Sequence, residues 1–296
     1  MILVVGGTGR LGEQVVTGLL ACGHEVRVLS RGLHAPPVPD DSRVDRVVGD
    51  VRDPRAVDRA MTGVTTVVSA AHGFVGAGRV SPASVDRDGN VLVVEAARRD
   101  GAEIVLLSVL GASGGASWDL LRMKYAAEQV AWASGCPVTV IRPAAFVQTW
   151  LEVLRSSAGR GHRPRLLGRG DNPIPWVDVR EVASVAVRAV DDRGLRGHTL
   201  ELVGPERLTL LELASAMMTA VGWAGEPQRV PRAVVHVVAR TVGVARPQVA
   251  RICRAALVMD ELVYPDDAAS RALVPGLPAT PASRIAADLA LAGSGY

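Results

Sequence analysis

The hydrophobic positions of the first 145 residues follow two different repeats. Short apolar runs end at glycine or at a polar residue, as at Ile2–Val5, Glu25–Leu29 and Val44–Val48. Between these runs, as in the segment 11–20, apolar side chains recur every three or four residues. The runs predict buried strands and the spaced pattern predicts amphipathic helices. Their alternation predicts the α/β class, with a doubly wound, Rossmann-like parallel sheet.

The same alternation continues to about residue 145. Further strands and helices are expected over Thr65–Ala70, 83–100, Glu103–Ser108, 117–134 and Val138–Ile141. Another helix is expected to begin at Asp53-Pro54, because aspartate is a common N-cap and proline suits the first helical position. This half of the chain therefore predicts one dinucleotide-binding type of domain over residues 1–145.

After residue 145 the pattern becomes mixed. Short strands are expected over Arg165–Gly168, Ile174–Val179 and His198–Val203, with helices near 180–191 and 209–221. A helix-rich tail follows from about residue 225. We expect residues 146–296 to form a smaller mixed α/β lobe for the substrate, interleaved with the first domain.

Composition narrows the class of protein. The 296 residues are 48% hydrophobic and 21% charged, which is typical of a globular chain with a large core. Aromatic residues are only 3% and no cationic run occurs, which argues against nucleic-acid binding. The absence of a long apolar stretch, a leader pattern or paired cysteines predicts a cytoplasmic protein without a membrane or metal partner.

The charges also single out one residue. Lys and Arg total 33 against 30 Asp and Glu, and every one of those cations except Lys124 is arginine. The arginine excess most simply reflects genome composition. The single lysine then indicates a position whose role requires an amine that arginine cannot replace.

The segment GGTGRLG at 6–12 follows the first predicted strand and opens a helix. Its glycines fit both G-x-x-G-x-x-G and G-x-G-x-x-G. Glycine permits a tight turn and close backbone approach, and a helix N-terminus offers unpaired N–H groups to a pyrophosphate. A purely structural turn is the less favoured alternative. The predicted dinucleotide-binding turn consists of Gly6, Thr8, Gly9, Arg10, Leu11 and Gly12.

The end of the second strand predicts which dinucleotide binds there. A site for NAD places an acidic residue at this point to hold the ribose hydroxyls. The sequence instead reads Ser30-Arg31, with no acid. The planar guanidinium of Arg31 suits a 2′-phosphate, Ser30 adds a hydroxyl, and Arg10 can supply a second cation. NADP(H) is therefore predicted rather than NAD(H).

Taken in order, these motifs resemble the atypical short-chain dehydrogenase/reductase superfamily, particularly its NmrA-like and isoflavone-reductase-like branch. The resemblance covers most of residues 1–222. It rests on GGTGRLG, HEVRVLSR, GDVRDP at 49–54, IVLLSVLGAS, KYAAEQV, VTVIRPAAF at 138–146, IPWVDVREVA at 174–183 and LELVGPERLTLLELA at 200–214.

The resemblance implies further cofactor contacts after the third, fourth and sixth strands. They are Asp50 and Val51 beside the adenine, Ala70, Ala71 and His72 along the ribose, and Pro143, Ala144 and Phe146 at the nicotinamide. Each position is also an ordinary strand-end loop, and that simpler interpretation stays open.

The usual catalytic pattern of the superfamily, Tyr-x-x-x-Lys with an upstream Ser, is incomplete. Aligning its lysine on Lys124 puts Leu120 at the tyrosine position. Tyr125 projects about 100° around the helix from Lys124, so it does not simply substitute for the missing tyrosine. Ser108 ends a predicted strand instead of following it. The Tyr/Ser mechanism therefore does not carry over to this chain.

Lys124 and His72 remain as candidate catalytic residues. The branch that lacks the tyrosine relies on lysine, so Lys124 is expected to bind the ribose hydroxyls or to exchange a proton. His72 lies in a glycine-rich loop and histidine is a natural acid, although a loop histidine without function is the simpler interpretation.

These features predict an NADP(H)-dependent oxidoreductase that reduces a carbonyl or an activated alkene. With few polar candidates, the substrate is expected to be small and apolar. It is expected to bind between the 72–82 loop, the 110–118 loop and the C-terminal lobe, lined by Trp118, Phe146, Trp150 and Trp176. The alternatives are a non-catalytic NmrA-like NADP(H) sensor and a non-redox isomerase or cyclase that retains the cofactor. Whether the chain forms a homodimer is left open.

Overall fold

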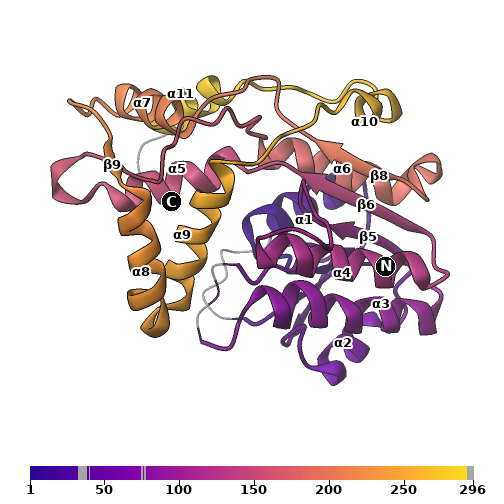
Figure 1. Ribbon diagram of the computed structural model, residues 1–296. Helices are drawn as coiled ribbons and strands as arrows, with labels where there is room; N and C mark the ends of the chain where they lie inside the picture. The colour runs from indigo at the N-terminus through magenta and orange to yellow at the C-terminus, as the bar shows by residue number, and fades with distance from the viewer. Residues whose placement is uncertain (33–38, 40, 75, 77, 292–296) are drawn as a thin grey trace. The chain divides into compact units, whose positions relative to one another are not determined.

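The computed structural model describes residues 1–32, 39, 41–74, 76 and 78–291. Within these residues the main sheet has seven strands in the order β3-β2-β1-β4-β5-β6-β8. Strands β5, β6 and β8 are labelled in Figure 1. Its strands are β1 (Ile2–Val5), β2 (Val26–Ser30), β3 (Val44–Val48), β4 (Thr66–Ser69), β5 (Glu103–Leu107), β6 (Val138–Pro143) and β8 (Thr199–Leu202). Every pairing from β3 across to β6 is parallel. The predicted Rossmann-like sheet is confirmed.

The chain divides into two compact units. The first comprises Met1–Pro143, Val179–Glu201 and Asp267–Leu277, and the second comprises Ala144–Asp178, Leu202–Asp266 and Pro278–Tyr296. The first unit therefore contains nearly all of the main sheet. It also includes two later segments of the chain, Val179–Glu201 and Asp267–Leu277.

Helices cover both faces of the main sheet. The helices of the first unit are α1 (Arg10–Ala21), α2 (Pro54–Met61), α3 (Asp88–Asp100), α4 (Asp119–Ala133), α6 (Val179–Asp191), the short η3 (Arg193–Leu195) and α10 (Ala268–Leu273). Leu3 and Val5 of β1 share a buried apolar cluster with α2, α3 and α4. Successive side chains of a strand point to opposite faces, so Ile2 and Val4 face the other layer, where α1 packs against α6.

Helix starts in the first unit follow from local side-chain chemistry. The Asp53 side chain accepts a hydrogen bond from Arg55 N at 3.0 Å, which confirms the predicted cap of α2. The predicted helix over 83–100 is instead two elements, a π-helix η1 (Pro82–Arg87) and then α3. Ser81 and Ser84 form a reciprocal capping box at the start of η1. The wider π turn changes which side chains face the interior, and periodicity of an α-helix does not anticipate that change.

The second unit combines a small sheet with helices. Its elements are α5 (Val147–Ser157), η2 (Gly159–Gly161), β7 (Arg165–Leu167), α7 (Leu210–Ala220), β9 (Gln228–Val230), α8 (Arg232–Ala245), α9 (Pro247–Met259) and α11 (Ala282–Leu291). β7 pairs in parallel with β9. The strand predicted over Ile174–Val179 is wrong, because only single bridges occur at Ile174 and Val177 and α6 begins at Val179. Pro173 and Pro175 remove two N–H donors that a ladder would need.

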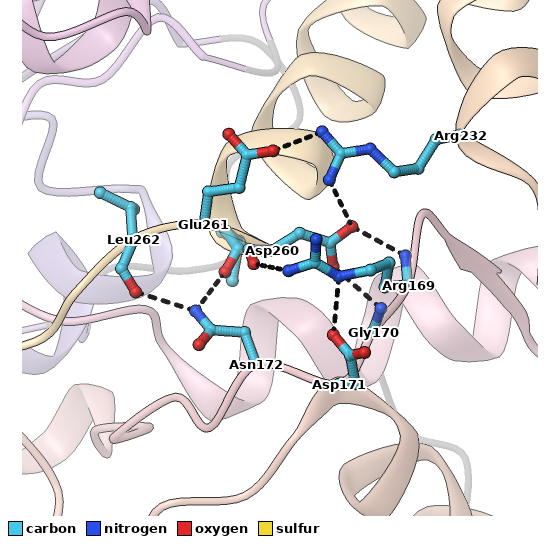
Figure 2. A network of polar contacts seen from close by, with 9 residues as sticks. Arg169, Gly170, Asp171, Asn172, Arg232, Asp260, Glu261 and Leu262 are labelled. Atoms are coloured by element: carbon cyan, nitrogen blue, oxygen red, sulfur yellow. Dashed lines mark hydrogen bonds and ion pairs between the residues drawn. The ribbon is translucent and has the colours of Figure 1, made fainter.

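A polar network fixes one loop of the second unit (Figure 2). The buried carboxylate of Asp260 accepts hydrogen bonds from Arg169 N at 2.7 Å and Gly170 N at 2.9 Å. Asn172 donates to the carbonyls of Met259 and Leu262 at 2.6 and 2.9 Å. These contacts tie the loop after β7 to the end of α9.

No helix in the described part of the chain is both long enough and apolar enough to cross a bilayer.

Candidate functional site

The predicted dinucleotide-binding turn lies at the carboxyl end of β1. Gly6 has a φ of +78°, a backbone conformation that favours glycine, and its carbonyl accepts a hydrogen bond from Gly9 N at 2.9 Å. A Cβ added at Gly12 would lie 2.1 Å from the Gly6 carbonyl oxygen. The turn therefore closes this tightly only when residue 12 is glycine.

The start of α1 has no side-chain cap. Its N-cap is Gly9, which provides no side-chain hydrogen bond to the first-turn N–H groups. Thr8 and Leu11 are half-buried in the turn and Arg10 is exposed. An uncapped helix N-terminus with a close glycine backbone is the arrangement that binds a pyrophosphate.

Ser30 and Arg31 lie where they were expected, at the end of β2. Ser30 is the last residue of the strand and Arg31 is exposed directly after it. Part of the loop that follows falls outside the described residues. Ser30 pairs with Val48 of β3, so Arg31 and Asp50 both follow the ends of neighbouring strands.

Asp50 is already engaged by a neighbour that the sequence did not single out. Arg52 donates to its two carboxylate oxygens at 2.9 and 2.7 Å, and these hydrogen bonds are the main cause that lowers the pKa of Asp50. Val51 is buried, and a Cβ on Gly89 would meet its side chain at 2.9 Å. The side chains of Asp50 and Val51, just after β3, are thus both held by their neighbours.

The end of β4 packs against the glycine turn. A Cβ on Gly6 would lie 3.1 Å from the Ala70 carbonyl oxygen and 3.2 Å from Ala71 Cα. Ala70 N also donates to Val5 O at 2.9 Å. The next residue along the chain is His72, so the structure brings this histidine to the same edge of the sheet as the turn.

Lys124 and His72 meet at a buried carboxylate, Asp86. Lys124 Nζ donates to the carbonyls of Leu107 at 2.8 Å and Ala71 at 3.2 Å, and it lies 3.1 Å from Asp86 Oδ1. His72 Nδ1 lies 3.5 Å from the same oxygen. The Asp86 side chain is 0% exposed and that of Lys124 6%, whereas that of His72 is 45% exposed. The cluster therefore runs from the interior to the surface.

The charge of Asp86 is stabilised by its neighbours. Burial alone would raise the pKa of its carboxyl, but the Lys124 ammonium, the hydrogen bond and charge of His72 and the Gly73 N–H together hold that pKa below its usual range. Gly73 N donates to Oδ2 at 2.9 Å. Oδ1 has no aligned hydrogen bond in the described part of the chain and faces the Lys124 ammonium at 3.1 Å and His72 Nδ1 at 3.5 Å instead.

Sequence reasoning missed Asp86. It lies in the π-helix η1, and Asn90 Nδ2 donates to its carbonyl at 2.8 Å while Asn90 Oδ1 accepts from Ser69 at 2.6 Å. Both polar residues are buried on a segment whose pattern predicts an apolar face. Two polar side chains at positions 86 and 90 of a buried face were the signal that could have found it.

The residues of the incomplete Tyr/Ser pattern have other roles here. Leu120 is buried and the Tyr125 ring lies over Gly114, where an added Cβ would meet it at 3.5 Å. Ser108 donates to the buried Glu128, which also binds Arg142 at 2.6 and 3.0 Å. These polar contacts join α4 to β6 and to Ser108, which directly follows β5.

Aromatic rings adjoin the exposed side of the cluster. The His72 and Phe74 ring centroids are 5.8 Å apart, and Phe74 meets Trp118 edge to face at 5.5 Å. Two residues of the loop after Phe74 fall outside the described residues. By contrast, Trp150 and Trp176 pack on each other inside the second unit, and Trp176 Nε1 donates to Leu208 O at 2.8 Å.

The remaining predicted cofactor contacts follow β6. Pro143 ends that strand in the first unit, and its carbonyl accepts from Leu110 N at 2.9 Å. Ala144 and Phe146 belong to the second unit, where Ala144 N donates to Leu202 O at 2.8 Å and Phe146 bridges Val177. Among the described side chains, no three His, Cys, Asp or Glu gather as metal ligands.

Comparison with known proteins gives matches over most of the chain. A family described as NAD(P)H-binding matches residues 6–193. An NAD(P)H azoreductase of Xenophilus azovorans is 30% identical over 224 residues, which cover 75% of this chain and 74% of the relative. A (4-alkanoyl-5-oxo-2,5-dihydrofuran-3-yl)methyl phosphate reductase of Streptomyces griseus is 31% identical over 223 residues, with the same coverage of 75% and 74%.

A solved structure shares the fold over nearly the whole chain. It is an NADPH-dependent quinone oxidoreductase of Escherichia coli complexed with NADPH, with a TM-score of 0.76 and 21% identity. The match covers 98% of this chain and 99% of that chain.

Proposed function

The chain belongs to the NAD(P)H-binding family, as its motifs predicted, and we propose that it is an NADP(H)-dependent oxidoreductase that reduces a carbonyl or an activated alkene of a small apolar molecule. The observation that carries this proposal is the contact between Gly6 and Ala70–Ala71. This contact brings the dinucleotide-binding turn and the Lys124–Asp86–His72 cluster to one edge of the sheet. In open α/β sheets, ligands bind at the carboxyl ends of the strands, which is this edge.

The residues present fit a dinucleotide. The close approach of Gly12 to Gly6 leaves no room for a Cβ at residue 12, and the start of α1 has no side-chain cap, so the backbone can come close to a pyrophosphate. Gly6, Thr8, Gly9, Arg10, Leu11 and Gly12 would hold the pyrophosphate. Asp50, Val51, Ala70 and Ala71 would border the adenosine side, and Pro143 the nicotinamide. The family resemblance supports these last assignments.

The end of β2 favours the 2′-phosphorylated form. Arg31 is exposed, and no carboxylate stands at Ser30 or Arg31 to bind the ribose hydroxyls. A carboxylate there would also repel a 2′-phosphate. Arg31 would instead bind that phosphate through its guanidinium fork, with Ser30 adding a hydroxyl donor.

The relatives support redox chemistry, since two of them are reductases by name. When bound, the dinucleotide would supply a hydride to the substrate. Lys124 would hold the segment after β4 beside the dinucleotide, because its ammonium donates to the Ala71 carbonyl. Ala71 is also the residue that packs against Gly6 of the glycine turn. Phe74 and Trp118 offer an apolar wall next to His72, which favours an apolar or aromatic substrate.

The proposal is tested by binding and by turnover. Isothermal titration with NADPH, NADP⁺, NADH and NAD⁺ should show tighter binding of the phosphorylated pair. NADPH oxidation should then be followed with 1,4-naphthoquinone, 2-cyclohexenone and the azo dye methyl red. Gly12→Ala, whose added Cβ would collide with the Gly6 carbonyl, is the variant expected to lose dinucleotide binding. Absence of dinucleotide binding would overturn the proposal altogether. Binding without turnover would favour an NADP(H) sensor, or an isomerase or cyclase that keeps the cofactor.

A further inference from the structure

We propose that His72 is the proton donor of this site and that Asp86 is the residue that positions it, with Lys124 serving Asp86 instead of the substrate. This inference rests on the proposed reductase function. The proton-donor role thus belongs to His72, with Asp86 as its positioning residue, and not to Lys124.

The surroundings of Lys124 argue against direct contact with a substrate. Its ammonium is directed to three oxygens of the interior, the carbonyls of Ala71 and Leu107 and the carboxylate of Asp86. Two of its three N–H donors bind the carbonyls, and Asp86 Oδ1 lies 3.1 Å away as the counter-charge. With a side chain only 6% exposed, Lys124 is directed to the interior and not to a ligand at the surface.

His72 has the opposite arrangement. Nδ1 is turned to Asp86, whereas Nε2 has no partner in the described part of the chain and the side chain is 45% exposed. The ring follows directly after the segment that packs on the glycine turn. It also adjoins Phe74, so an apolar substrate held against that ring would lie next to the imidazole.

Asp86 can orient the imidazole because it is itself fixed. Gly73 N and Lys124 hold the carboxylate from two sides, and Asn90 holds the Asp86 backbone carbonyl. The groups that face Asp86 are thus Lys124 from α4 and His72 and Gly73 from the loop after β4. A buried carboxylate at Nδ1 keeps a proton on that nitrogen and leaves Nε2 for proton transfer, as in other carboxylate–histidine pairs.

With a carbonyl substrate, the hydride that a bound NADPH would supply would form the new C–H bond, with loss of two electrons from the dinucleotide, and the C=O π pair would move to oxygen. The alkoxide oxygen takes the proton of protonated His72 Nε2. The neutral imidazole, still protonated at Nδ1, then recovers a proton from solvent.

The first test needs no cofactor or substrate. In the free full-length chain, ¹⁵N NMR of the histidine side chains should show neutral His72 with its proton on Nδ1, with His72→Gln identifying its signal among the six histidines. Asp86→Asn should mix the two tautomers. Because that variant leaves Lys124 unpaired, the double variant Asp86→Asn/Lys124→Met should be measured as well. A proton on Nε2 in the parent, or an unchanged tautomer in both variants, would overturn the positioning role.

The second test uses NADPH with the three acceptors named above. His72→Gln should lower kcat by about a hundredfold or more while leaving the Kd for NADPH unchanged. His24→Gln is the matched control, because His24 Nε2 lies 3.1 Å from Asp191 in an exposed pair on the same unit. Full activity of His72→Gln would overturn the donor role. An inactive parent would instead refute the reductase function and the donor role together, while the tautomer measurement would still decide whether Asp86 orients His72.

Discussion

Lys124 Nζ lies 3.1 Å from Asp86 Oδ1, and both side chains are withdrawn from solvent. The two residues come from different elements, α4 and the π-helix η1, so the ion pair joins these elements in the interior of the first unit. A buried ion pair is costly to form, but breaking it is costlier because one charge is left without its partner. The stability of this region should therefore depend on keeping both residues or removing both.

Asp86→Asn should lower the free energy of unfolding by about 3–5 kcal/mol, because the buried Lys124 ammonium loses its counter-charge. Adding Lys124→Met should recover a large part of that loss, since the orphaned charge is then removed. Urea denaturation followed by circular dichroism measures both variants. Asp58→Asn, which breaks the exposed pair with Arg99, is the control and should cost about 1 kcal/mol or less. A double variant no more stable than Asp86→Asn would refute this coupling.

The contribution of Asp86 should also depend on pH with a definite sign. Its folded pKa is lowered, so the unfolded chain binds a proton at this site before the folded chain does. The stabilisation is fully present above the unfolded value of about 3.9 and is lost as pH falls through the folded pKa. The difference in unfolding free energy between parent and Asp86→Asn should therefore shrink as pH falls below about 4. A difference that widens in acid would mean that burial outweighs the Lys124 charge.

Much of the fold could be predicted because its signals are local. The run at Ile2–Val5, the glycine turn and the Asp53 cap each depend on residues adjacent in sequence, and each lies where it was expected. The segment Ile174–Val179 was misjudged because its apolar residues satisfied a strand pattern while two prolines removed the donors. The π-helix was missed because hydrophobic periodicity does not distinguish it from the α-helix that follows.

The site was predicted only in part for a different reason. Lys124 was conspicuous as the single lysine, and His72 through its glycine-rich loop. Asp86 became significant only through its contacts with residues distant in the chain, which no local pattern encodes. The partners of Lys124 are likewise set by tertiary packing, so the sequence could place this lysine without determining whether it faces a substrate.

Gly12→Ala should damage the dinucleotide site. The added Cβ would lie 2.1 Å from the Gly6 carbonyl oxygen, so the turn must shift, at a cost of about 1–3 kcal/mol in stability. Because the shifted backbone no longer fits a pyrophosphate, affinity for NADPH should fall by at least about tenfold. Thermal unfolding and isothermal titration measure the two effects. Gly161→Ala, where a Cβ meets nothing within 4 Å, is the matched control and should bind NADPH normally.

Arg31→Gln should change which dinucleotide is preferred. Loss of a charged hydrogen bond to the 2′-phosphate should weaken NADPH binding by about 10- to 100-fold. NADH lacks that phosphate, so its affinity should change little, and titration with both dinucleotides gives the ratio. Arg98→Gln, at an exposed arginine near the end of α3, removes the same charge elsewhere and should leave the ratio as in the parent. An unchanged ratio in Arg31→Gln would place the phosphate contact elsewhere.

Ser108→Ala separates a structural serine from a catalytic one. The hydroxyl donates to Glu128, whose carboxylate is buried and also bound by Arg142, so the serine is committed to the interior. Removing a hydrogen bond to a buried charge should lower stability by about 1–3 kcal/mol. A serine that assisted proton transfer would instead lower kcat by about a hundredfold or more when replaced. Denaturation and NADPH oxidation measured on the same preparation distinguish the two roles, and we expect the stability to fall while turnover of the folded enzyme persists.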